Sequence, residues 1–138
     1  MQKLMFIPSM ICYMLACYFP SFIVEGEGYP EVGGWFLSLF GWVGLVMDSS
    51  LLSLFYFSWF ANVTYLFAII SLLHNRSKSF HIWMVCTFVL GMSFLFCPSV
   101  IKDESGQMFA IDSMAIGYYL WIGSFFCLWM GGLCALKR

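Results

Sequence analysis

The chain has 138 residues, of which 62% are hydrophobic and only 9% are charged, and its formal net charge is -1. Soluble domains carry roughly 25% charged residues, so this composition excludes an ordinary soluble protein and indicates a membrane protein. The apolar runs use most of the chain and leave no room for a separate folded soluble domain. The lipid bilayer is therefore the first expected partner, and no nucleic-acid partner is expected.

Four uncharged runs are long enough to cross the roughly 30 Å hydrocarbon core of a bilayer, which takes about 20 helical residues. They extend from Leu4 to Val24, Ser49 to Leu73, Ser79 to Ile101 and Ser113 to Leu136. We therefore predict an all-α, polytopic membrane protein that forms a single domain over residues 1–138. Its four transmembrane helices are expected over residues 4–24, 51–73, 80–100 and 114–136.

The first run follows a basic residue, Lys3, so a secretory or lipoprotein signal has to be weighed. The MLAC stretch ending at Cys17 only partly resembles a lipobox, because Leu15 is bulky where a small residue is usual. We expect an uncleaved first helix.

The stretch YPEVGGWFLSLFGWVGLVMDSS, from Tyr29 to Ser50, is apolar but bounded by two acids, Glu31 and Asp48. At 1.5 Å per residue, a helix over residues 35–47 would be only about 20 Å long, too short to cross unaided. Its pattern has two faces at helical spacing. The small face holds Gly34, Ser38, Gly41, Gly44 and Asp48, and the large face holds Trp35, Phe36, Leu39, Phe40, Val43, Val46 and Met47. We predict a short interfacial helix over residues 34–47, between the first and second spans, with a re-entrant segment as the alternative.

The distribution of charge predicts the orientation. With four spans and a cytoplasmic N-terminus, the basic residues gather on the cytoplasmic side, as the positive-inside rule requires. These are Lys3, Arg76, Lys78, Lys137 and Arg138, whereas Lys102 alone lies outside. The acidic residues then all lie on the outer side, namely Glu25, Glu27, Glu31, Asp48, Asp103, Glu104 and Asp112. A fifth span would destroy this segregation, so both termini are predicted to be cytoplasmic.

Few polar side chains lie inside the predicted spans. Asn62, one helical turn after Ser58, is the most polar of them near mid-membrane. We interpret Asn62 as a partner in an interhelical hydrogen bond, and a role in lining a polar pathway is the alternative. In the final span, small residues recur at helical spacing at Gly123, Cys127, Gly131 and Cys134. This stripe predicts close helix packing, either within the bundle or between subunits.

We find no pattern that supports catalysis or metal binding. The six cysteines lie inside apolar runs with no CxxC spacing, which argues against a disulfide framework and against a zinc site. The GMS sequence at residues 91–93 superficially matches a serine hydrolase, but a nucleophile needs a base within hydrogen-bond reach. The histidines, His74 and His81, flank the cytoplasmic turn at the other end of the span. We therefore predict no catalytic residue, no metal site and no cofactor.

Two stretches carry a resemblance to known proteins: FSWFANVTYLFAIISLL at residues 57–73 and GYYLWIGSFF at residues 117–126. An aromatic-Ala-Asn step, a short basic turn and a Gly-Tyr-Tyr-Leu-Trp entry into the last span resemble small four-helix bacterial membrane proteins of uncharacterised function. The resemblance covers most of the chain from Gly34 onward. It implies a multi-pass protein of the bacterial inner membrane and implies no activity or site residues.

Two hypotheses about function follow. The leading one is a non-enzymatic integral membrane protein that acts through helix packing, with copies of itself or with another membrane protein, as an assembly subunit or an immunity protein does. The alternative is a small oligomeric channel or transporter component with outer acidic residues at its mouth. The spans contain no Asp, Glu, Lys or Arg, whereas proton-coupled carriers usually place an ionisable group in the membrane. Flux measurements in liposomes would separate the two hypotheses.

Overall fold

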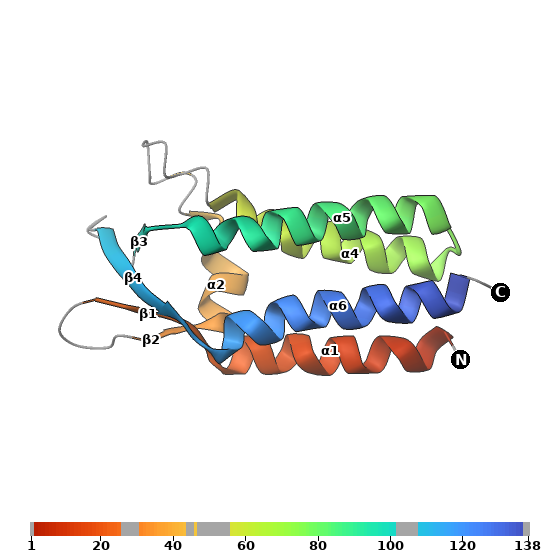
Figure 1. The fold of residues 1–138 in the computed structure, drawn as a ribbon, viewed down its shortest axis with the longest axis horizontal. Helices are drawn as coiled ribbons and strands as arrows, with labels where there is room; N and C mark the ends of the chain where they lie inside the picture. The colour runs from red at the N-terminus through yellow and green to blue at the C-terminus, as the bar shows by residue number, and fades with distance from the viewer. Residues whose placement is uncertain (1, 26–30, 44–45, 47–55, 102–107, 137–138) are drawn as a thin grey trace.

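The computed structural model describes residues 2–25, 31–43, 46, 56–101 and 108–136. Its four long helices are α1 (Gln2–Tyr18), α4 (Phe60–Leu73), α5 (Ser77–Ser93) and α6 (Ile116–Leu136). α1 packs beside α6 and α4 beside α5, so the helices form two layers of two (Figure 1). Both ends of the chain and the turn between α4 and α5 lie at one end of the bundle, and the strands lie at the other (Figure 1).

The strands form a small curled sheet beyond the helix ends. They are β1 (Pro20–Val24), β2 (Glu31–Gly33), β3 (Ser99–Ile101) and β4 (Met108–Met114). The order is β2-β1-β4-β3, and every neighbouring pair is antiparallel. β1 continues directly from α1, and β4 leads directly into α6, so the central pairing of β1 with β4 ties the ends of these two helices together.

This sheet corrects the all-α prediction. β1 occupies the end of the first predicted span, and β3 occupies the end of the third. β4 occupies part of the segment between the third and fourth predicted spans, which is expected from the sequence to be an outer loop. α1 ends at Tyr18, and Pro20, which lacks a backbone N–H and disfavours a longer helix, is the first residue of β1. The buried strand residues Phe22 and Val24 are as apolar as residues of a membrane helix, so hydropathy alone does not separate a buried strand from the end of a span.

Three stretches are long and apolar enough to cross a membrane: Tyr56–Leu73, Ser77–Phe96 and Ile116–Ala135. The first adds a short 3-10 turn to α4, and the second adds the 3-10 helix η2 (Phe94–Phe96) to α5. α1 has 17 residues and is about 25 Å long, and its apolar part, Phe6–Tyr18, is shorter still. A fourth span therefore stays a prediction, and residues 51–55 of the second predicted span lie outside the described residues.

The short helix α2 (Gly34–Phe40) is the described part of the interfacial helix expected over residues 34–47, of which residues 44–45 and 47 lie outside the described part. It lies across the sheet end of the bundle, between the two layers (Figure 1). A Cβ added to Gly34 would lie 1.9 Å from the carbonyl oxygen of Ala16, so only glycine allows α2 to approach α1 this closely. On the same face, the Ser38 carbonyl accepts a hydrogen bond from Trp59 Nε1 at 3.0 Å. The opposite face exposes Trp35, Phe36, Leu39 and Phe40, which confirms the two-faced pattern for these residues.

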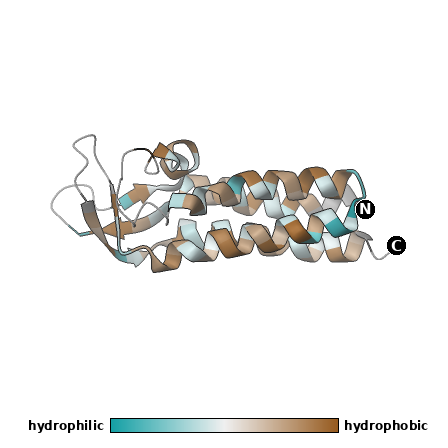
Figure 2. Cartoon of the chain, turned by 90° about the horizontal axis from the view of Figure 1, so that it is seen from above, coloured by the Kyte–Doolittle hydropathy of each residue, from teal (hydrophilic) through white to brown (hydrophobic). Residues whose placement is uncertain are grey.

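Several polar groups are buried inside the bundle beside its apolar core, and many large apolar side chains are exposed on its outer surface. The side chains of Ser9, Thr87 and Ser124 are fully buried, and the Thr87 hydroxyl donates a hydrogen bond of 2.8 Å to the Thr64 hydroxyl. Hydrophobic residues predominate along the length of the helices (Figure 2). Exposed examples, one from each long helix, are Ile11, Leu66, Val89 and Phe126. A bilayer favours this distribution, because lipid solvates apolar side chains while polar groups need partners within the protein.

Gly132 of α6 marks a close approach to α5. A Cβ at this position would lie 2.3 Å from Cζ of Phe80, whose ring is itself fully buried. We predict that Gly132→Leu lowers the free energy of unfolding by about 2 to 3 kcal/mol, because the added side chain forces α5 and α6 apart. Equilibrium unfolding of the purified protein in mixed micelles measures this change.

Gly123→Leu is the matched control on the same helix. A Cβ at Gly123 meets no described atom within 4 Å, so we expect a change of less than about 0.5 kcal/mol in the same measurement. Equal destabilisation by the two substitutions would contradict this account of the packing.

Candidate functional site

A hydrogen-bonded junction joins three helices near the sheet end of the bundle. The Tyr13 hydroxyl of α1 donates to Asn62 Oδ1 of α4 at 3.1 Å, and Trp121 Nε1 of α6 donates to the same oxygen at 2.9 Å. An indole N–H can only donate, so the atom facing it must be the amide oxygen, and this fixes the orientation of the Asn62 amide. Asn62 therefore ties α4 to both helices of the other layer.

A second polar layer lies one helical turn away, toward the cytoplasmic end predicted above. The Ser9 hydroxyl shares a hydrogen bond with the Tyr65 hydroxyl and donates to the Ser124 carbonyl at 2.7 Å. The rings of Tyr13 and Tyr65 stack with centroids 5.5 Å apart and an interplanar angle of 7°. On each of the three helices, the residue of this second polar layer lies three or four positions from the residue of the Asn62 junction. The two sets of polar residues therefore lie on the same helix faces.

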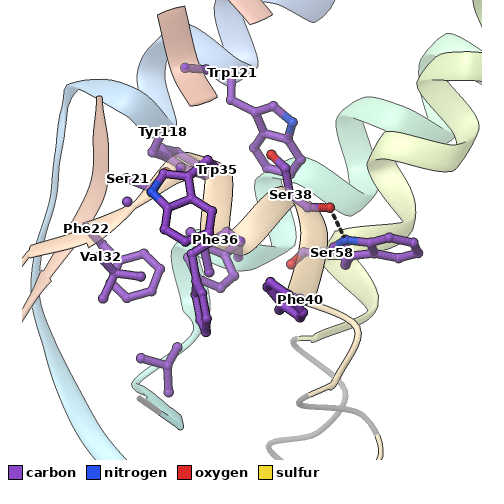
Figure 3. Close-up of a pocket in the computed structure, with 18 of the residues that line it drawn as sticks. Ser21, Phe22, Val32, Trp35, Phe36, Ser38, Phe40, Ser58, Tyr118 and Trp121 are labelled. Atoms are coloured by element: carbon purple, nitrogen blue, oxygen red, sulfur yellow. Dashed lines mark hydrogen bonds between the residues drawn. The ribbon is translucent and has the colours of Figure 1, made fainter. Parts of the chain in front are cut away.

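A cavity of about 870 Å³ lies beside the Asn62 junction, at the sheet end of the bundle. Its walls come from α1, β1, β2, α2, α4 and the turn before it, η2, β3 and α6, and aromatic side chains supply much of them (Figure 3). Six of the aromatic lining residues are Phe22, Trp35, Phe36, Phe40, Tyr118 and Trp121. Ligand pockets in proteins typically measure roughly 300 to 1,000 Å³, so this space is large enough for a small organic molecule.

The polar lining of the cavity is sparse and mostly uncharged. It includes the hydroxyls of Ser21 and Ser58, which are 7% and 6% exposed, and the half-buried Asn62. Glu31, an exposed residue of β2, also lines the cavity, and none of the described lining residues carries a positive charge. The structure thus brings Ser58 and Asn62, which the sequence singled out together, to one cavity wall.

The four small residues of the predicted α6 stripe differ in how far they are exposed. Gly123 and Gly131 are half-buried, Cys127 contacts Cys12 of α1, and Cys134 is exposed. The tight contact with α5 instead involves Gly132, one residue away from the stripe.

The predicted charged residues that the structure describes lie at opposite ends of the bundle. Arg76 and Lys78 are exposed at the turn between α4 and α5, and Glu25 and Glu31 are exposed beside the sheet. Asp112 is exposed in β4 at the sheet end, and Lys3 lies in the first turn of α1 at the opposite end. Six further residues of these two groups lie outside the described residues, namely Glu27, Asp48, Asp103, Glu104, Lys137 and Arg138.

Sequence reasoning missed the partners of Asn62. Tyr13 and Trp121 sit in apolar runs where aromatic residues are abundant, and nothing in their local pattern distinguishes them from membrane-facing aromatics. Only the spacing offered a signal, because Ser9 and Tyr13 are four residues apart and so mark one polar face of the first helix.

Comparison with protein-family models, with curated proteins and with solved structures gives no match to this chain. The resemblance to small four-helix membrane proteins therefore stays a prediction. Within the described part of the chain, no three His, Cys, Asp or Glu side chains are grouped as metal ligands would be.

Asn62→Leu removes the acceptor for both the Tyr13 hydroxyl and the Trp121 indole N–H. We predict that this substitution lowers the free energy of unfolding by about 1 to 2 kcal/mol and leaves membrane insertion unchanged. A double-mutant cycle with Tyr13→Phe, measured by unfolding in mixed micelles, tests the contact itself. If Tyr13→Phe costs the same in the Asn62→Leu background as in the wild type, the two side chains are not coupled and the junction is not formed.

Proposed function

We propose that this chain is a non-enzymatic integral membrane protein whose four long helices all cross the bilayer, in the inner membrane of a bacterium. Three helices of sufficient length and apolarity support this topology, together with the exposed apolar side chains of α1 such as Ile7, Ile11 and Met14. The short length of α1 is compatible with crossing if the bilayer thins locally or flanking residues extend the span.

The arrangement of the chain supports cytoplasmic termini. The N-terminus, the C-terminus and the basic turn with Arg76 and Lys78 lie at one end of the bundle (Figure 1), while Glu25, Glu31 and Asp112 lie at the sheet end. Positive residues are retained on the cytoplasmic side of bacterial membranes, so the sheet and α2 would lie on the outer side.

In this proposal the protein acts by packing against a second copy of itself or against another membrane protein, as an assembly subunit or an immunity protein does. The observation that carries the proposal is the open space at Gly123. A Cβ there meets no described atom within 4 Å, whereas Gly117 and Gly132 on the same helix are closely packed against other elements. A glycine without a close neighbour lets a further helix backbone approach, and close approach is what drives association in lipid.

The cavity favours a second candidate, a small channel or transporter component that works as an oligomer. The cavity reaches the polar Asn62 junction between the two helix layers, as a binding site in a transporter does. Net flux of a solute through liposomes that contain the purified chain would favour this candidate over the first.

The topology predicts where reporter fusions will be active. Fusions after Arg76 and after Arg138 should both report a cytoplasmic location, and a fusion after Ser105 should report an external one, because only four spans segregate the basic residues. Paired phosphatase and fluorescent-protein fusions measure this. An external report at Arg138 would contradict the four-span topology.

The partner surface at Gly123 predicts a change in assembly without a change in fold. We expect Gly123→Leu to unfold like the wild type but to lose self-association, because the leucine side chain fills the space that a second backbone would occupy. Sizing in mild detergent and crosslinking in native membranes measure the assembly.

Ile82→Leu is a control substitution on the exposed face of α5 and should leave the assembly unchanged. If the wild type is a monomer in detergent and in nanodiscs and crosslinks to no other protein in native membranes, packing at Gly123 is not its function.

A further inference from the structure

The cavity contains polar groups that the protein leaves without partners. Neither the Ser21 hydroxyl nor the Ser58 hydroxyl makes a hydrogen bond with the described residues, although both side chains are more than nine-tenths buried. Among the described residues, the unpaired side-chain atoms that are fully enclosed are His81 Nδ1 and Trp129 Nε1. The two serine oxygens are not among them, so both are accessible from the cavity. Buried polar groups are normally paired with the protein, a ligand or ordered water, so these hydroxyls indicate that the cavity has an occupant.

The side-chain amide of Asn62 indicates which hydrogen-bonding group the occupant carries. Its Oδ1 already accepts hydrogen bonds from Tyr13 and Trp121, so the amide oxygen is satisfied. Its Nδ2 group carries two N–H donors, for which no acceptor is found among the described residues. The cavity therefore presents an amide that can only donate, with the Ser58 hydroxyl one helical turn before it in sequence. The complementary group is a hydrogen-bond acceptor such as a carbonyl oxygen.

The walls exclude a charged occupant. No described lining residue is cationic, so a buried anion would have no ion-pair partner. The only ionised group of the described lining, Glu31, is exposed to solvent and repels anions. A cation could approach Glu31, but it would leave the donor groups of Asn62 unpaired. A neutral molecule with a hydrogen-bond acceptor needs no ion-pair partner and can pair with the donor groups of Asn62.

The aromatic walls require that most of the molecule be apolar. Phe22 is almost fully buried against this space, and Trp35, Phe36 and Phe40 of α2 extend the apolar wall to the outer surface (Figure 3). α2 lies at the sheet end, where the bundle would meet the outer face of the bilayer, so a molecule dissolved in lipid can reach the cavity there.

We propose that this cavity binds a neutral, lipid-soluble carbonyl compound, whose oxygen accepts hydrogen bonds from Asn62 Nδ2 and the Ser58 hydroxyl. The apolar part of the ligand packs against Phe22, Trp35 and Phe36. This site is separate from the Gly123 surface of α6, so either proposal can fail without the other.

The test compares two probes that differ only in the carbonyl group, 2-tridecanone and tridecane. The full chain in nanodiscs is equilibrated with each probe, and retention is compared with that of empty nanodiscs. We expect saturable retention of the ketone by the protein and only lipid partitioning of the alkane. With a 13C-labelled carbonyl, the infrared stretch of the bound ketone should shift to lower frequency than that of the ketone dissolved in lipid, because the oxygen accepts hydrogen bonds.

Substitutions locate the bound probe. Ser58→Ala and Asn62→Leu should each lower the affinity for the ketone by about tenfold, since each removes a donor to the carbonyl. Ser58→Ala preserves the Asn62 junction and so tests the site without disturbing the fold. Thr87→Val, which removes a hydroxyl in the bundle away from the cavity, should leave binding unchanged, as should Gly123→Leu.

Three results would overturn the proposal. Equal retention of the ketone and the alkane would show that the carbonyl is not recognised. Saturable binding of dodecyltrimethylammonium but not of the ketone would assign the cavity to a cation. Retention of the ketone no greater than in empty nanodiscs would show that the protein has no site for it.

Discussion

The arrangement of the bundle depends on the interhelical hydrogen bonds of Asn62. In a bilayer the lipid is as apolar as a leucine side chain, so two helix layers gain little from hydrophobic association and rely on packing and polar contacts. One amide oxygen accepts donors from α1 and α6, and thereby connects the α4 layer to the α1–α6 layer. The contacts of Ser9 with Tyr65 and Ser124 repeat this connection one turn away. Together, these contacts fix the alignment of the α4 layer along the α1–α6 layer.

The sheet end of the bundle is organised differently, because α2 lies between the layers there. Gly34 allows the start of α2 to contact the end of α1, and the Trp59 indole holds the Ser38 carbonyl near the start of α4. The pairing of β1 with β4 fixes the same ends of α1 and α6 from outside. The cavity therefore has walls that are held on several sides, which preorganises it for binding.

Two features of the molecule are suited to binding, and they differ in chemistry. The cavity is partly open, has largely aromatic walls and presents donor groups, so the proposed ligand would be recognised by its hydrogen-bond acceptor. A Cβ at Gly123 on α6 would meet no described atom within 4 Å, so the proposed partner would be recognised there by its shape.

The sequence by itself determined the strongly apolar character of the chain, the number and approximate position of the long helices, the short two-faced helix and the separation of basic from acidic residues. These properties depend on local composition and periodicity, which hydropathy and spacing report directly. Asn62 and Ser58 could also be singled out, because polar residues are rare in apolar runs.

Only the tertiary structure decided the sheet, the partners of Asn62 and the position of the close α5–α6 contact. β1 and β4 are distant in sequence and form a pair only when α1 and α6 pack side by side. Gly131 and Gly132 are adjacent, and their spacing from other small residues favoured the stripe containing Gly131, whereas the buried Phe80 ring meets Gly132. Which of two neighbouring glycines faces another helix depends on the rotation of α6, and that rotation is set by the burial of large side chains such as Phe125 and Leu128 against other elements.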